Sequence, residues 1–167
     1  MTDRAVFGRF YTSFTPAGTE VWLANGTSVS VSPVSTQDFT AGTNLIQGEA
    51  VYVSGTYVFP ATAISGVSLT NATVVGLTSS SASTSSTVSV ILDEVAVVSD
   101  ANITAERFLT PGEYYYLSKY PGQVTKFITS SGNISASGNY QALTVVGQAV
   151  SSSELKIEIE PPLSIYT

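Results

Sequence analysis

Residues 112–118 are the most informative part of the chain and read Gly-Glu-Tyr-Tyr-Tyr-Leu-Ser. Turn signals flank them, Pro111-Gly112 before and Pro121-Gly122 after. Proline presets φ near −65° and glycine accepts positive φ, so this pair favours a type II turn. Tyrosines and leucine between two such turns predict a β-strand. Tyr114 and Tyr116 are expected on one face of that strand, with Tyr115 and Leu117 on the other.

The sequence contains this pattern twice. Three pairs of blocks recur in the same order, and they are 48–54 with 112–118, 72–76 with 143–147, and 88–92 with 155–159. The second pair ends in Val-Val-Gly in both copies. A glycine inside a strand pattern marks a bulge or a close backbone approach. Repetition of this kind predicts two similar β-units.

We therefore expect an all-β protein, made of two similar small β-barrel or β-sandwich units with an N-terminal β-hairpin arm. The hairpin is predicted by Asn25-Gly26 between two strand-like runs. The expected boundaries are 1–38 for the arm, 39–99 for the first β-unit, 100–160 for the second β-unit and 161–167 for a C-terminal tail. Two prolines, Pro161 and Pro162, separate this tail from the preceding strand.

Composition argues against several classes of function. The chain of 167 residues has a net charge of −6, and its six Lys and Arg are scattered, so nucleic-acid binding is not expected. No apolar run reaches the length of a membrane span, and no signal peptide is expected. The chain contains neither His nor Cys. Triads and zinc sites of the usual kind are therefore excluded, and we expect no enzyme, no cofactor and no metal.

One acidic cluster contains side chains that could bind a metal ion. Asp100, Asn102, Thr104 and Glu106 alternate along the chain and offer oxygen ligands of the kind Ca²⁺ takes. The glycine that an EF-hand loop needs at its sixth position is missing. A solvated loop between the two β-units is the favoured interpretation. A carboxylate-based enzyme is the remaining catalytic alternative.

Several short motifs of the second copy resemble a module of tailed-bacteriophage virion structural proteins, found in head decoration proteins, head fibres and tail fibres. The matching residues are Leu109-Thr110-Pro111-Gly112, Tyr115-Tyr116-Leu117-Ser118, Pro121-Gly122, Val124-Thr125, Val146-Gly147 and Ala149-Val150-Ser151. The first copy matches more loosely, and the N-terminal segment does not match. The resemblance implies a small all-β fold, commonly a homotrimer, without catalysis or cofactor.

The resemblance implies a capsid decoration (cement) or head-fibre protein that binds the major capsid protein on the outer shell and stabilises that shell. The expected location is the virion, on the capsid surface, after synthesis in the host cytoplasm. The alternative is a tail-fibre or baseplate module that binds a host receptor or glycan. A bacterial adhesin or pilin-like subunit is less favoured because it should carry a signal peptide.

Two groups of residues are assigned to contacts. The N-terminal segment is rich in aromatic side chains, which either belong to an ordinary first hairpin or insert into a neighbouring subunit. On the second interpretation, the expected capsid contacts are Phe7, Phe10, Tyr11, Phe14 and Trp22. Rings on both faces of the 114–117 strand favour a subunit interface. The expected self-association residues are Tyr114, Tyr115, Tyr116, Leu155, Ile157 and Ile159.

Overall fold

The protein is described here by a computed structural model. The structure describes the backbone of residues 12–15, 18–22 and 28–31, and residues 35–64, 69–126 and 141–165 more fully. The regular elements of the described residues are β-strands and two short 3-10 helices, so the all-β prediction is confirmed. The chain divides into two compact units, Met1–Val34 and Ser35–Thr167.

The N-terminal unit contains a three-stranded antiparallel sheet. Its strands are β1 (Thr12–Thr15), β2 (Gly18–Trp22) and β3 (Ser28–Val31), in the order β1-β2-β3. Strands β2 and β3 pair from Thr19 opposite Val31 to Trp22 opposite Ser28. They flank Asn25-Gly26, so the predicted hairpin is confirmed, and β1 adds a strand that the sequence did not predict.

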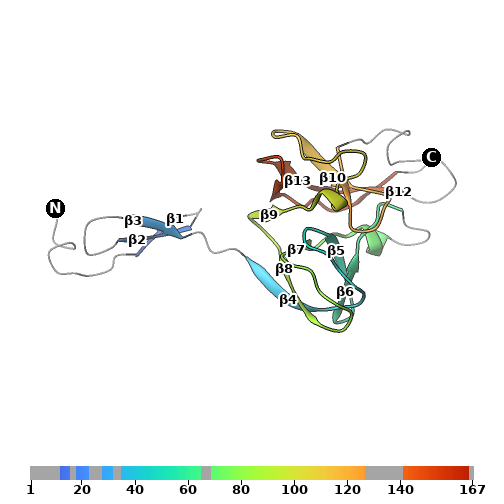
Figure 1. The fold of residues 1–167 in the computed structure, drawn as a ribbon, viewed down its shortest axis with the longest axis horizontal. Helices are drawn as coiled ribbons and strands as arrows, with labels where there is room; N and C mark the ends of the chain where they lie inside the picture. The colour runs from blue at the N-terminus through green and yellow to red at the C-terminus, as the bar shows by residue number, and fades with distance from the viewer. Residues whose placement is uncertain are drawn as a thin grey trace. The chain divides into compact units, whose positions relative to one another are not determined.

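The first part of the larger unit is a closed five-stranded barrel (Figure 1). Its strands are β4 (Thr36–Ala41), β5 (Ala50–Ser54), β6 (Tyr57–Pro60), β7 (Gly76–Thr78) and β8 (Thr87–Ile91), with η1 (Leu69–Ala72) between β6 and β7. The order around the barrel is β4-β6-β5-β7-β8. All pairs are antiparallel except β4 with β6, whose parallel pairing closes the ring.

The second part of the larger unit, which we call the second unit, repeats this topology in an open sheet. Its strands are β9 (Val95–Val97), β10 (Tyr114–Leu117), β11 (Val124–Thr125), β13 (Val145–Ala149) and β14 (Glu154–Ile157), with η2 (Asp100–Asn102) after β9. The sheet order is β11-β10-β13-β14-β9. A single parallel bridge, Ile103 with Val124, links its two ends at the place where β4 pairs with β6 in the barrel.

Hydrogen bonds recur at equivalent positions in the two parts. The amide of Gly48 donates to Thr78 O and that of Gly112 donates to Ala149 O, both at 2.8 Å. Likewise Gly42 N donates to Val58 O at 2.9 Å, and Thr104 N donates to Val124 O at 2.8 Å. The barrel and the second unit are therefore two copies of one fold, as the sequence repeat predicted.

The third pair of repeated blocks requires a correction. Ser79 N donates to Ser89 O in the barrel, and Val150 N donates to Glu154 O in the second unit, both at 2.9 Å. Val90 is therefore equivalent to Leu155, two residues away from the correspondence that the sequence suggested. A strand repeats its facing every two residues, so the apolar pattern cannot reveal a shift of two.

A shared hydrophobic core joins the two copies. Val51, Val58, Val88 and Val90 fill the barrel together with Ala41 and Leu45. A second cluster fills the second unit and also includes Ala50, Leu77 and Ile91 from the barrel. Ala50 and Val51 are adjacent on β5 and point to opposite faces, so the strand is buried by the barrel on one side and by the second unit on the other.

The C-terminal tail forms a strand within its own chain. Strand β15 (Leu163–Ile165) pairs antiparallel with β12 (Gln141–Leu143), from Gln141 opposite Ile165 to Leu143 opposite Leu163. Strand β14 ends at Ile157, before Pro161 and Pro162. A new strand therefore begins after the prolines, as their lack of an amide hydrogen requires.

Candidate functional site

The predicted capsid contacts lie in the N-terminal unit. Phe14 belongs to β1 and Trp22 to β2, and only the backbone is described at both positions. Phe7, Phe10 and Tyr11 lie outside the described residues. Their assignment to a capsid contact stays a prediction.

The predicted self-association residues divide into buried and exposed side chains. Tyr115, Leu155 and Ile157 are buried in the core of their own chain, and Ile159 packs against that core. Tyr116 is half-buried, and Tyr114 is 45% exposed. The strand therefore alternates as predicted, and Tyr114 offers the most surface of this group to another molecule.

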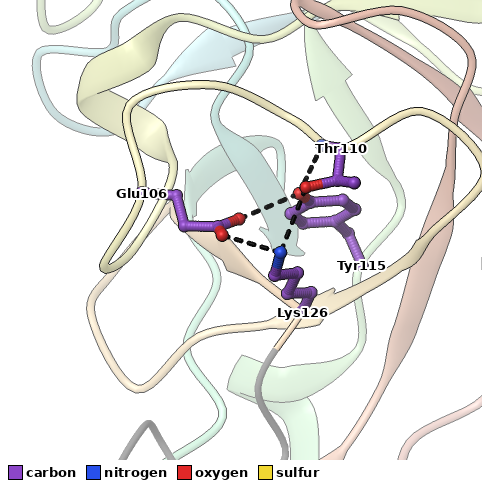
Figure 2. A network of polar contacts seen from close by, with 4 residues as sticks. All are labelled: Glu106, Thr110, Tyr115 and Lys126. Carbon is purple, nitrogen blue, oxygen red and sulfur yellow. Dashed lines mark hydrogen bonds and ion pairs between the residues drawn. The ribbon is translucent and has the colours of Figure 1, made fainter.

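The buried ring of Tyr115 ends in a polar network (Figure 2). Its hydroxyl accepts a hydrogen bond from Thr110 N at 2.9 Å and donates to Glu106 Oε2 at 3.3 Å. Lys126 Nζ lies 2.7 Å from Glu106 Oε1 and donates to Thr110 Oγ1 at 3.1 Å. The hydrogen bond to Glu106 raises the pKa of the Lys126 ammonium, so this lysine stays charged and partnered. The network fastens the 104–111 loop to the core and leaves no group poised as a nucleophile or base.

The acidic cluster between the two copies is divided: its two neutral members are buried, whereas Asp100 is exposed and Glu106 is half-buried. Asn102 is buried and donates from Nδ2 to Gln47 O at 2.9 Å. Thr104 is buried and its hydroxyl lies 2.8 Å from Ser118 Oγ and 2.7 Å from Gln123 Oε1. The expectation of a solvated loop is therefore wrong for Asn102 and Thr104, because both satisfy buried polar partners. In the part of the chain that the structure describes, no three or more His, Cys, Asp or Glu side chains lie together so that they could hold a metal ion.

An open hollow lies beside the end of β5. Its volume is about 380 Å³, and it is lined by Val53, Leu69, Thr70, Thr73 and Val75. These side chains are aliphatic or carry a hydroxyl, and none of them titrates near neutral pH. The hollow therefore provides no acid or base for catalysis.

The strand registers bring several exposed apolar side chains together on the outer face of the second unit. Tyr114 lies opposite Gln148, Gln148 opposite Lys156, and Lys156 opposite Val95, which makes one row across four strands. A second row contains Glu154 opposite Val97, and the Val150 amide donates to Glu154 O. Tyr114, Val95, Val97 and Val150 are each more than two-fifths exposed. We call these two rows the outer face.

Sequence reasoning missed the valines of this face. Val95 and Val97 alternate with the buried Ala96 and Val98, a two-residue period that indicates a strand. The expected boundary at residue 99 left them at the end of the first β-unit. The alternation could therefore be recognised in the sequence, but the strand that pairs with Val95–Val97 could not.

Glu49 lies at the junction of the two copies and makes the stability of the protein depend on pH. Its Oε2 accepts a hydrogen bond from Ile46 N at 3.0 Å, and its amide donates to Thr78 Oγ1 at 3.0 Å. Burial raises the pKa of the Glu49 carboxyl, and the Ile46 hydrogen bond partly opposes this shift. The folded state therefore binds the proton more tightly than the unfolded state does.

We expect Glu49→Gln to remove a contribution to stability that falls as pH rises. The raised pKa stabilises the native protein fully below the ordinary value of 4.5, and this contribution is lost as pH rises through the folded pKa. The stability of the wild type minus that of the variant should therefore fall across this window. Urea unfolding from pH 4 to pH 7 measures it. Glu113→Gln, at the exposed equivalent position, corrects for the loss of one charge, and parallel curves for wild type and Glu49→Gln would contradict the assignment.

In the described residues, no helix has the length and apolar character needed to cross a membrane. Comparison with protein-family models and with curated proteins finds no match to this chain.

Proposed function

We propose that this protein is a capsid decoration (cement) or head-fibre protein of a tailed bacteriophage. It binds the major capsid protein on the outer shell as a homotrimer and stabilises that shell. The motifs of residues 109–151 support this proposal through their resemblance to virion structural proteins. The location on the virion and the absence of catalysis belong to the same proposal.

The observation that carries the proposal is a double β-unit with exposed apolar side chains on one face, joined to a separate N-terminal sheet. The outer face presents Tyr114, Val95, Val97 and Val150 on strands fixed by a continuous core. The N-terminal sheet is a compact unit of its own and carries Phe14 and Trp22. One region can therefore associate with other copies while the other binds the shell, an arrangement suited to a protein that assembles on a surface.

Cementing needs only a modest interface per copy. A bound ligand stabilises the state it binds, and linked sites multiply the effect of each single contact. Many trimers on one shell would thus raise its resistance to heat without any covalent chemistry. The direct test adds the purified protein to undecorated capsids and follows sedimentation and thermal disruption of the shells. Binding to host cells, with no binding to capsids, would favour the tail-fibre alternative.

The arm is expected to supply the capsid contact. Replacing Phe7, Phe10 and Phe14 by alanine together should abolish decoration, because aromatic anchors supply most of the energy of an interface. Co-sedimentation of the variant with undecorated capsids measures the loss. Phe108→Ala is the matched control, since Phe108 is 66% exposed and lies outside the arm. Normal decoration by the triple variant would refute the contact assignment.

A further inference from the structure

The barrel contributes one side of the junction between the two copies of the β-unit. Residues 47–50 form part of it, and Gln47 O accepts a hydrogen bond from Asn102 Nδ2. Gly48 is packed against the second unit so closely that a Cβ there would lie 2.5 Å from Val97 O and 2.7 Å from Val98 Cα. Ala50, Leu77 and Ile91 complete this side and are buried.

The second unit contributes the other side of the junction. It consists of residues 97–102 and the turn that ends at Gly122. The carbonyl of Gly122 accepts a hydrogen bond from Ala50 N at 2.9 Å, and a Cβ on Gly122 would lie 3.0 Å from Glu49 Cγ. The turn of the second copy is therefore hydrogen-bonded to the start of β5, and residues 97–98 of the second copy pack against Gly48.

Each side of this junction has an open equivalent in the other copy. Ala50 pairs with Leu77 in the barrel, and Tyr114 pairs with Gln148 at the same place in the second unit. Ala50 is 0% exposed and Tyr114 is 45% exposed. Gly112 is equivalent to Gly48, and a Cβ on it would meet nothing within 4 Å. The part of the outer face around Gly112, Tyr114, Gln148 and Lys156 is thus the uncovered counterpart of a buried surface, and we call it the open face.

The covering side is likewise uncovered in the barrel. The turn between β5 and β6 is equivalent to the turn that ends at Gly122. Its Gly55 has a positive φ like Gly122, and a Cβ there would meet nothing within 4 Å. Tyr57 follows it and is 44% exposed, and Asp38 on β4 is exposed at the position of Val97. We call residues 54–57 with Asp38 the turn surface.

We propose that two molecules of this protein associate head to tail, with the turn surface of one molecule on the open face of the next. The contact repeats between chains the junction that already exists within the chain. Such an interface is heterologous, because each molecule uses two different surfaces. The open face has Tyr, Gln and Lys where the barrel has Ala, Leu and Ile. An aromatic centre with a polar rim is typical of contacts between proteins that also exist apart.

This inference rests on the self-association part of the proposed function and not on capsid binding. Its test uses the purified full-length chain alone, so a failure to bind capsids leaves it unaffected. Two variants each damage one surface, Tyr114→Glu on the open face and Tyr57→Glu on the turn surface. Both rings are more than two-fifths exposed, so the core is spared, and circular dichroism confirms the fold. Tyr120→Glu, at a 49% exposed tyrosine outside both surfaces, is the matched control.

Light scattering after size-exclusion chromatography measures the oligomeric state of each protein. The wild type and the Tyr120→Glu control are expected to form the same oligomer. Each of the other two variants alone should lose at least about tenfold in association constant, as loss of a central aromatic anchor predicts. An equimolar mixture of Tyr114→Glu and Tyr57→Glu should form a one-to-one pair, because one intact open face then meets one intact turn surface.

Three results would overturn the inference. The first is a wild type that stays monomeric at the highest soluble concentration. The second is a mixture that stays monomeric when the wild type is oligomeric. The third is an unchanged oligomer for Tyr57→Glu together with a monomer for Tyr114→Glu, since this pattern would mean that the open face pairs with itself.

Discussion

Replacing Gly147 by alanine is expected to destabilise the protein by about 3 kcal/mol or more. A Cβ at this position would lie 2.0 Å from the carbonyl oxygen of Lys156 on the neighbouring strand. The obstacle is backbone, so β13 and β14 would have to separate. Overpacking of this kind costs about 1–3 kcal/mol or more, and each ladder hydrogen bond lost adds about 1 kcal/mol. Urea unfolding of the purified variant measures the change.

Two further glycines complete the test. Gly76 is the equivalent position in the barrel, where a Cβ would lie 2.2 Å from Ile91 O, and its alanine variant should be damaged to a similar degree. Gly112 has a φ of +88° and open space around it, so alanine there costs only the backbone strain of about 1–2 kcal/mol. Equal losses at Gly147 and Gly112 would show that close approach of the strands is not the cause.

These glycines were the most predictable part of the fold. The sequence places Gly76 and Gly147 inside strand patterns at the end of two matching Val-Val-Gly blocks, which predicts either a bulge or a close backbone approach. The facing of the tyrosines was equally accessible, since Tyr115 had to point away from Tyr114 and Tyr116. Local periodicity decides both features, and neither depends on knowing which strands pair.

The relation between the two copies could not be predicted in this way. Ala50 and Tyr114 occupy equivalent places, and one is buried only because another unit covers it. Likewise, the local sequence does not predict that Asn102 and Thr104 are buried. Their hydrogen-bond partners, Gln47 and Gln123, lie 55 and 19 residues away along the chain. Burial of a polar side chain in a loop is a property of the assembled junction. The sequence therefore predicted strands and repeats better than it predicted surfaces.

Replacing Tyr115 by alanine is the second large effect that we expect. The ring is fully buried in the core of the second unit, so its removal should cost about 3–5 kcal/mol through lost burial and the resulting cavity. Tyr115→Phe keeps the ring and removes the hydroxyl, which leaves Thr110 N without its acceptor. Thr110 is exposed, so water can replace this acceptor, and the loss should be that of a typical hydrogen bond, about 0.5–1.5 kcal/mol. Tyr114→Phe is the control, because its ring is 45% exposed and the change should stay within about 0.5 kcal/mol.

A double-mutant cycle can separate the contributions to stability of the two hydrogen-bond partners of the Tyr115 hydroxyl. The Tyr115 hydroxyl lies 2.9 Å from Thr110 N and 3.3 Å from Glu106 Oε2, so the backbone amide is the closer partner. We expect Tyr115→Phe and Glu106→Gln to combine almost additively, with an interaction free energy below about 0.5 kcal/mol in a double-mutant cycle. Glu106 holds Lys126 at 2.7 Å, and both side chains are partly exposed, so its own replacement should cost little. An interaction free energy above about 1 kcal/mol would mean that the carboxylate, and not the Thr110 amide, fixes the tyrosine and with it the loop that precedes β10.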